Sequence, residues 1–280
     1  MKRRNNEDRL MSGHKPQSSE DIPQMPNPMD FVTPTEFVPL PSRGRYPEEH
    51  PLSGQDSIEI KYMTAKDEDI LTNKSLLKKG LAIDRLIQNV IKDEAIDART
   101  LYVGDRNAIM IHARASAYGR DYRTSVTCPA CGESGKFKFD LGDHEEYLGD
   151  GWKDFDIEDK GDGTFTTALP ISKIVARIRP LTGKDEAIML GDAADQKSFN
   201  ENLVTRQMSH FVVDYNGYTD EKTLTHVSEN MTATDAKFLR ECFKLISPDI
   251  KMEQEFVCKH CDHKEVVMVP FGTDFFWPDR

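Results

Sequence analysis

Two CxxC pairs, Cys128–Cys131 and Cys258–Cys261, constrain this chain of 280 residues more than any other feature, because each pair follows a segment that occurs twice. The segment Ile60–Leu71 precedes the first pair, and Ile178–Met189 precedes the second. Six of the twelve aligned positions in these segments are identical. The sequence therefore predicts an internal duplication in which each half supplies one pair of thiolates.

The cysteine pairs predict a structural metal site. Thiolates separated by two residues on a tight turn both point at one ion, and two such turns complete the tetrahedron of a zinc site. We expect one zinc ion per chain, held by Cys128, Cys131, Cys258 and Cys261. Such a site has no open coordination position, so we expect no metal catalysis. Because 126 residues separate the two pairs, the metal would join two halves of a fold in the manner of a zinc ribbon. The alternatives are two separate sites that include His260 or His263, iron in place of zinc, and a metal-free protein.

The composition excludes several classes of protein. The 37 basic and 48 acidic residues give a net charge of −11, which argues against the basic surface that nucleic-acid binding normally needs. The N-terminus leads into no apolar stretch, so it does not resemble a signal peptide. No segment approaches the roughly 20 apolar residues of a membrane span. Four of the five cysteines lie in close pairs, which favours metal binding in a reducing compartment over a disulfide framework. We expect a soluble protein that is made inside a cell.

The distribution of prolines and of the duplicated segments predicts an α+β fold in five parts. Residues 1–54 contain nine of the fifteen prolines and form an extended or disordered arm. The first repeat, 55–144, and the second repeat, 171–273, each follow the order strand, helices, strand and cysteine turn. A hairpin over residues 145–170 connects the repeats, and residues 274–280 form an aromatic tail.

Local patterns support this organisation. A shift of 130 residues superposes the cysteines and also aligns Asp105 with Asp235, each ahead of an apolar helical stretch. The Lys-Asp-Glu triplets at 66–68 and 184–186 follow a threonine closely, which indicates helix caps rather than catalytic carboxylates. A further helix is predicted after residue 80, with a buried stripe of Ile83, Leu86, Ile87, Val90 and Ile91.

Other reactive residues have simpler structural explanations. Cys242 lies on an apolar helical stripe and is typical of a buried structural thiol. The segment Asp154–Gly163 resembles a calcium loop, but it lacks the glycine at the sixth position and the flanking helices, so we interpret it as part of a hairpin that turns at residues 160–163. We find no phosphate-binding glycine loop, nucleophile elbow or acid–base pair, and we expect a protein that is not an enzyme.

Apolar and aromatic residues in the arm and the tail predict contacts with partner proteins, because large aromatic side chains are typical interface anchors. The candidates are Phe37, Leu40, Tyr46, Phe275, Phe276 and Trp277. The alternatives are a plain linker for the arm and packing onto the chain's own core for the tail. Basic residues near the cysteines, such as Arg123 and Lys136, are interleaved with acidic ones, and a zinc ribbon that binds nucleic acid is the alternative function.

Six motifs occur together in a distinctive order. They are Leu40–Pro47 (LPSRGRYP), Tyr62–Leu71 (YMTAKDEDIL), Leu101–Ala108 (LYVGDRNA), Tyr118–Tyr122 (YGRDY), Cys128–Cys131 (CPAC) and Leu181–Glu186 (LTGKDE). This combination resembles the baseplate hub subunit and hub-assembly family of T4-like contractile-tailed bacteriophages, over about residues 37–277. The resemblance implies a non-enzymatic viral protein made in the host bacterial cytoplasm. It would act with other baseplate proteins, either as a component of the tail baseplate or as a chaperone of hub assembly.

Overall fold

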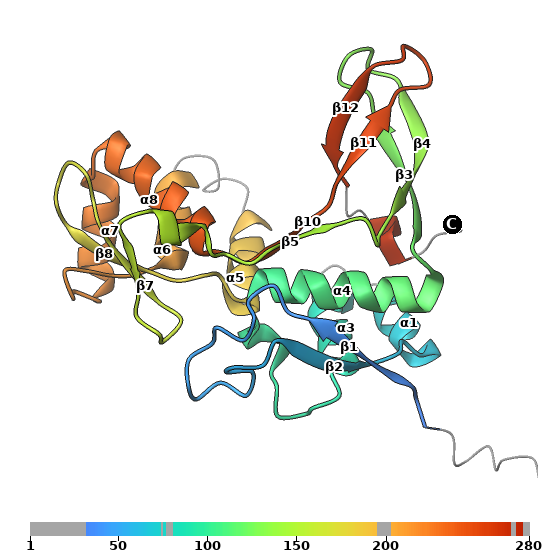
Figure 1. Ribbon diagram of the computed structural model, residues 1–280, viewed down its shortest axis with the longest axis horizontal. Coiled ribbons are helices and arrows are strands. Elements are labelled where there is room, and N and C mark those ends of the chain that lie inside the picture. The colour runs from blue at the N-terminus through green and yellow to red at the C-terminus, as the bar shows by residue number, and fades with distance from the viewer. Residues whose placement is uncertain (1–31, 74, 77–80, 195–202, 270–272, 277–280) are drawn as a thin grey trace, which may run out of the picture. The chain divides into compact units, whose positions relative to one another are not determined.

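The computed structural model of the protein describes residues 32–73, 75–76, 81–194, 203–269 and 273–276. The chain divides into a segment that ends at Thr33 and a folded unit that begins at Pro34, and every helix and strand described below belongs to the folded unit. Helices and strands both contribute to this unit, which confirms the α+β class (Figure 1).

The folded unit begins about twenty residues earlier than the sequence predicted. Residues 34–54 were assigned to an extended arm, but this stretch includes the strand β1 (Thr35–Pro39) and a loop whose apolar side chains are buried. Leu40, Tyr46 and Leu52 join the main hydrophobic core. Prolines restrict the backbone without preventing burial of the apolar residues between them. The remainder of the predicted arm, residues 1–31, lies outside the described residues.

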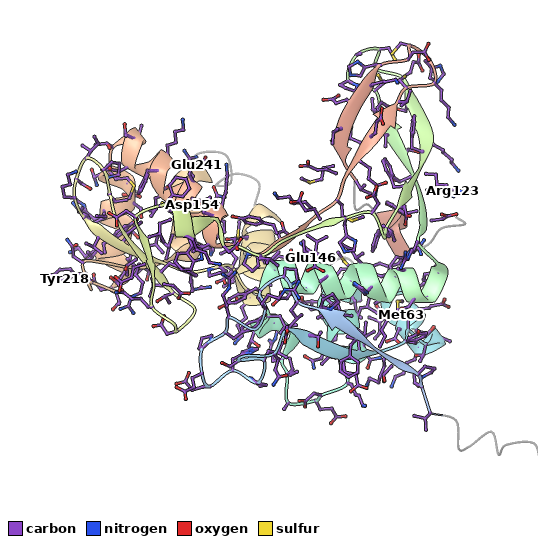
Figure 2. All side chains as sticks on the ribbon, viewed as in Figure 1. Met63, Arg123, Glu146, Asp154, Tyr218 and Glu241 are labelled. Atoms are coloured by element: carbon purple, nitrogen blue, oxygen red, sulfur yellow. The ribbon has the colours of Figure 1, made fainter. Side chains whose placement is uncertain are left out.

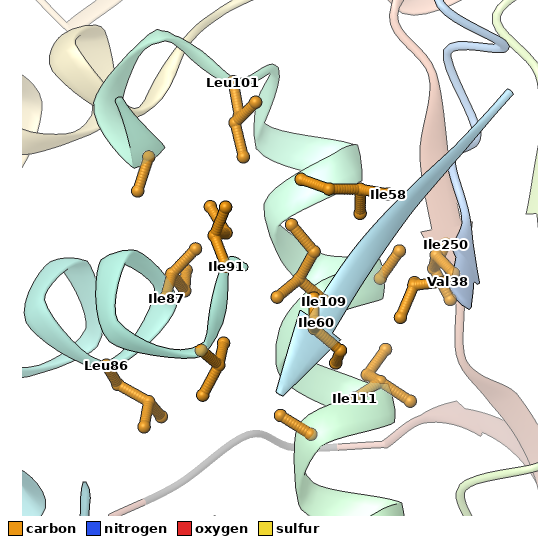
Figure 3. Packing of buried hydrophobic residues seen from close by; sticks show 14 of the residues in the cluster. Val38, Ile58, Ile60, Leu86, Ile87, Ile91, Leu101, Ile109, Ile111 and Ile250 are labelled. Atoms are coloured by element: carbon orange, nitrogen blue, oxygen red, sulfur yellow. The ribbon is translucent and has the colours of Figure 1, made fainter. Parts of the chain in front are cut away.

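The N-terminal part of the folded unit combines a β-ribbon with helices. Its elements are β1, β2 (Ser57–Lys61), α1 (Ala65–Thr72), α3 (Ala82–Val90), η3 (Ala98–Thr100) and α4 (Val103–Tyr118). β1 and β2 pair antiparallel, and Ile91, which follows α3 directly, bridges to Ile60 on β2. Ile58 and Ile60 alternate along β2 with exposed or half-buried residues and pack against the apolar faces of α3 and α4 (Figure 3). Three residues of the predicted stripe on α3, Leu86, Ile87 and Val90, are buried there.

A second α+β part follows. Its elements are η4 (Gly151–Asp154), β6 (Ile157–Asp159), β7 (Phe165–Ala168), β8 (Val175–Ile178), α5 (Gly183–Ala194), α6 (Leu203–Phe211), β9 (Val212–Tyr215), α7 (Glu221–Asn230) and α8 (Ala233–Ile246). The four strands form an antiparallel sheet in the order β6-β7-β8-β9. Leu239, Cys242 and Ile246 of α8 lie in one buried cluster with residues of this sheet, as the apolar stripe on that helix predicted.

The connecting hairpin predicted for residues 145–170 is only partly correct. β6 and β7 do form a hairpin that turns at residues 160–163. However, β7 also pairs with β8, so the hairpin is half of a larger sheet. The start of the predicted hairpin is instead the strand β5 (Glu145–Tyr147), which pairs with β10 (Asp249–Lys251). Phe165 and Thr167 of β7 are buried, and Phe165 packs in one cluster with Leu239 and Ile246 of α8.

Two further hairpins carry the cysteine pairs. One consists of β3 (Asp121–Thr127) and β4 (Ser134–Asp140), and the other of β11 (Glu253–Val257) and β12 (Lys264–Met268). A short helical turn, η5 (Thr273–Phe276), follows near the C-terminus and contacts β3.

Candidate metal centre

The cysteine turns at the tips of the two hairpins have the same backbone geometry. In the first turn, the N–H of Gly132 donates to the carbonyl of Cys128 at 2.9 Å. In the second, the N–H of Asp262 donates to the carbonyl of Cys258 at 3.1 Å. Gly132 and Asp262 both adopt a left-handed backbone, with φ of 75° and 54°. Glycine adopts this conformation without strain, and aspartate is one of the few other residues that tolerate it.

The two turns lie at the same end of the paired hairpins (Figure 1), and their four thiol groups gather there. The Sγ atoms of Cys128 and Cys261 lie 3.8 Å apart, as do those of Cys131 and Cys258. All four sulfur atoms lie within 4.8 Å of one another. Sulfur atoms at the corners of a tetrahedron about 2.3 Å from a central zinc ion would be separated by about 3.8 Å. A disulfide would require a sulfur–sulfur distance of about 2.05 Å, so the quartet has the geometry of a metal site.

The histidines of the second turn are not members of this group. The ligand atoms that gather among the described residues belong to the four cysteines alone. His260 contributes its backbone N–H, which lies 3.4 Å from the Sγ of Cys258. The imidazole of His263 instead lies 3.4 Å from the carboxylate of Glu265. The structure therefore brings together the four cysteines of the single-site hypothesis. Among the described residues, it leaves His260 and His263, the additional ligands of the two-site alternative, outside the group.

The thiols differ in their tendency to ionise. The backbone N–H of His260 is the largest influence on Cys258 and lowers the pKa of that thiol to about 6. For Cys261, the N–H of His263 acts in the same direction, but desolvation and the neighbouring thiols outweigh it and raise the pKa to about 12. Four sulfur atoms this close therefore do not all become thiolates by themselves near neutral pH. A bound cation would supply the compensating charge.

A small hydrophobic cluster supports the cysteines. Cys128 and Cys258 are buried together with Phe256, whereas Cys131 and Cys261 are exposed. The rings of Phe137 and Phe256 lie 4.4 Å apart between the hairpins, with Val126 and Val267 packed against the same cluster. These supporting residues were not predicted from the sequence. A signal was present beside the first pair, because Phe137 and Phe139 alternate with charged residues along β4.

The structure places the predicted partner-binding residues of the arm in different environments. Phe37 lies on β1 with 69% of its surface exposed. Leu40 is fully buried, and the ring of Tyr46 is stacked between those of His50 and Tyr102 at 4.2 and 4.3 Å. In this conformation Leu40 and Tyr46 therefore stabilise the chain's own core.

The predicted aromatic tail has a similar outcome where it is described. Phe275 and Phe276 are buried, and the ring of Phe275 meets that of Tyr122 edge-on at 5.2 Å. The guanidinium of the fully buried Arg114 donates to the carbonyl of Phe275 at 2.6 Å. The two phenylalanines thus pack onto the chain's own core, which was the alternative for the tail. Trp277 lies outside the described residues.

The remaining reactive side chains, Cys242 and the two Lys-Asp-Glu triplets, have structural roles. Cys242 is buried on α8, and desolvation raises the pKa of its thiol to about 11, which suits an inert side chain. Asp67 and Asp185 accept hydrogen bonds from the backbone N–H of Thr64 and Thr182, both at 2.8 Å. These contacts are the helix caps that the two Lys-Asp-Glu triplets predicted.

Part of the chain is similar to a known protein family. Residues 43–161 match the family model of the T4 bacteriophage base plate protein, which supports the resemblance noted from the motifs. The matched segment includes the first cysteine pair and ends before the second. The search of curated proteins and the search of solved structures returned no match. Among the described residues, no helix combines the length and apolar character needed to cross a membrane.

Proposed function

Taking the chain as a T4-like phage baseplate protein, as the family match supports, we propose that it is a non-enzymatic component or assembly factor of the tail baseplate hub, with two halves stapled by one zinc ion. The family match supports the baseplate role, and the four neighbouring sulfur atoms support a zinc cross-link between the halves. The nucleic-acid alternative gains no support from the family match.

The donor set of the metal centre favours zinc in a structural role. Four thiolates in a tetrahedron are typical of structural zinc sites, and they leave no coordination position for a substrate. Cys128, Cys131, Cys258 and Cys261 would hold the ion, which would neutralise part of the thiolate charge. Iron is the competing metal for such a set, and elemental analysis of the purified protein distinguishes the two.

The chain path supports the proposed duplication. The first half would run through β1, β2, α1, α3, α4, β3 and β4, and the second through β7, β8, α5, α6, α8, β11 and β12. In both halves the first two strands pair antiparallel. The residue that follows the second helix then returns to the second strand: Ile91 bridges to Ile60, and Val212 pairs with Ile178.

Two buried carboxylates extend this correspondence. Asp105 and Asp235 each occupy the third position of a helix, α4 and α8 respectively, and both are fully buried. Asp105 accepts a hydrogen bond from the N–H of Ser42, three residues after β1 ends. Asp235 accepts one from the N–H of Ile171, three residues after β7 ends. Each half thus fixes the loop after its first strand with the same helix carboxylate.

The zinc ion would act as a long-range cross-link between the halves. It would join cysteine turns that are separated by 126 residues, and a cross-link that closes a loop of this length contributes about 5 kcal/mol in the chain-entropy treatment. The closed site would thus stabilise the fold and position the two hairpins against each other.

Other phage baseplate proteins are the proposed partners, with assembly in the host bacterial cytoplasm and a place in the virion tail for a retained component. Phe37 remains a proposed contact, because it is exposed and borders a cleft of about 460 Å³ that Leu52, Ile58 and Lys92 also line. The burial of the other described candidates makes them less suitable anchors.

Quantitative mass spectrometry of purified virions beside infected-cell lysate tests the proposed role. Recovery in virions in a fixed ratio to other baseplate proteins indicates a structural component. Abundance in the lysate, association with hub proteins there, and absence from virions indicate an assembly factor. A protein that is absent from virions and associates with no hub or baseplate protein would contradict both forms of the proposal.

A further inference from the structure

The two cysteine hairpins differ on the faces that point away from their shared core. On β3–β4 this face is polar: Lys138 forms an ion pair with Asp121 at 2.8 Å, and Arg123 lies on the same side (Figure 2). On β11–β12 the corresponding face carries Val266 and Met268, which are 62% and 70% exposed. Since side chains alternate along a strand, these two residues point away from Val267, which packs against the core.

The backbone of β12 is also unpaired along one edge. The N–H of Val269 donates to Met252 at 2.7 Å, and that of Cys258 donates to His263 at 2.9 Å. In an antiparallel ladder the residues bonded to the neighbouring strand alternate with residues whose N–H and C=O point away from it. The outward-pointing groups therefore belong to Lys264, Val266 and Met268. Among the described residues, these three make no backbone hydrogen bond on the side away from β11.

Charged residues complete this surface. Lys264 stands at the tip end of β12, and Glu253 stands opposite Met268 at the base end of β11. Glu255, opposite Val266, lies on the same face. All three are exposed, and within the described part of the chain none forms an ion pair. A positive charge at one end and negative charges toward the other make the surface complementary to a reversed copy of itself.

We propose that β12 pairs antiparallel with β12 of a second copy of this chain, with Val266 opposite its own counterpart. This register matches Lys264 with Met268 of the second copy, so the outward-pointing backbone groups of both strands meet. On the outer face, each Lys264 then crosses the partner's Met268 and reaches the partner's Glu253. The two hairpins become one four-stranded sheet with a central apolar cluster of valine and methionine side chains.

The distribution of charge selects this partner over an unrelated strand. Unpaired edge strands commonly recruit another strand, and a two-fold contact requires the same surface on both copies. Only the reversed direction brings the lysine end of one edge to the glutamate end of the other. The contact uses a surface separate from the metal centre and does not depend on which metal is bound or on the baseplate role.

Sedimentation velocity on the full-length, metal-loaded protein across a concentration series tests the proposal. The wild type is expected to show a monomer–dimer equilibrium. Val266→Lys places two added ammonium groups at the centre of the contact and is expected to weaken dimerisation by at least about tenfold. Ile188→Lys, at a residue that is 54% exposed on α5, is the matched control and should leave the equilibrium unchanged. Metal content and thermal unfolding of each variant verify that it is folded.

Charge reversal tests the register. Lys264→Glu and Glu253→Lys, each alone, place like charges opposite each other and should weaken the dimer. An equimolar mixture of these two variants restores both attractive pairs and should dimerise again. A wild type that stays monomeric at all concentrations would overturn the proposal, as would a dimer that Val266→Lys leaves intact or a mixture that fails to recover.

Discussion

The two proposed halves of the folded unit have the same chain path but differ in where their connections are long. Residues 40–56 connect β1 to β2 in the first half, whereas only residues 169–174 connect β7 to β8 in the second. The second half has its extra residues between the helix cap and the cysteines: Asp185 and Cys258 are 73 positions apart (258 − 185), against 61 for Asp67 and Cys128 (128 − 67). The differences offset each other, so that the first strands and the cysteine turns both keep a spacing of 130 residues.

This comparison shows which features the fold retains and which it varies. The cysteine turns and the buried helix carboxylates occur in both proposed halves. The turns gather the four sulfur atoms, and each carboxylate holds the loop after the first strand. The long connection of the first half became part of the core, because Leu40 and Tyr46 pack into it. Substitutions in the features that the halves share should have the largest effects, and substitutions in the features that distinguish them should have smaller ones.

The largest effect should follow removal of one metal ligand. Cys128→Ser is expected to abolish stoichiometric metal binding and to lower the free energy of unfolding by about 5 kcal/mol, because the cross-link between the halves is lost. Metal analysis and urea unfolding measure the two effects. Cys242→Ala, at a buried thiol outside the centre, is the control and should retain the metal. Unchanged metal content in Cys128→Ser would show that the cysteines do not act as one site.

A smaller loss should follow Tyr46→Phe, which affects the first half alone. The Tyr46 hydroxyl donates to the carboxylate of Asp105 at 2.6 Å and accepts from the N–H of Tyr102 at 2.9 Å. Removing it leaves two buried polar groups without this partner and should cost about 2 kcal/mol. Urea unfolding measures the loss, and Tyr62→Phe, at a partly exposed tyrosine, is the control. Equal stability of both variants would show that the long loop contributes little to the core.

Phe256→Leu tests the support beneath the metal centre. The leucine side chain fills the space beside Phe137 less completely, and we expect a loss of about 1 kcal/mol in unfolding free energy. The affinity for the metal should fall with it, as measured by competition with a chelator. Phe155→Leu, at an exposed phenylalanine, provides the comparison. The same affinity in both variants would mean that the aromatic pair does not help to hold the cysteine turns.

The smallest predicted effect is a difference in how Asp105 and Asp235 change the stability of the fold with pH. Burial raises the pKa of Asp105. Desolvation acts in the same direction on Asp235, but the backbone N–H groups of Ile171 and Ser172 help to outweigh it and lower the pKa of that carboxyl. The contribution of Asp105 is therefore present at low pH and is lost as the pH rises from about 3.9 through its raised pKa. The contribution of Asp235 is present above about 3.9 and is lost as the pH falls through its lowered pKa.

Urea unfolding between neutral and acidic pH measures this contrast. As the pH falls, the wild type should gain stability relative to Asp105→Asn and lose stability relative to Asp235→Asn. If both differences changed in the same direction, the two carboxylates would not have the opposite electrostatic environments that their contacts indicate.

Much of the candidate site could be predicted from the sequence because its signals are local. The spacing within each CxxC pair determines the turn, and a threonine followed by an aspartate three residues later determines the helix caps. The repetition of both patterns linked the two cysteine pairs to one site. The apolar stripe after residue 80 likewise predicted α3.

The parts that sequence reasoning missed depend on contacts between distant residues. Tyr46 is buried where its ring stacks on Tyr102 and its hydroxyl meets Asp105, 59 positions away. β5 is a strand because it pairs with β10, about one hundred residues later. Neither segment has a periodicity that indicates its partner, and the prolines around Tyr46 suggested an extended arm. Sequence patterns identify a local element more readily than the surface on which it packs.

X-ray absorption spectroscopy of the purified protein at the zinc edge tests the central claim most directly. One zinc ion per chain, with four sulfur neighbours at about 2.3 Å and no nitrogen or oxygen ligand, is the expected result. Nitrogen or oxygen in the first coordination sphere, two ions per chain, or a protein that retains no zinc would contradict a single staple between the halves.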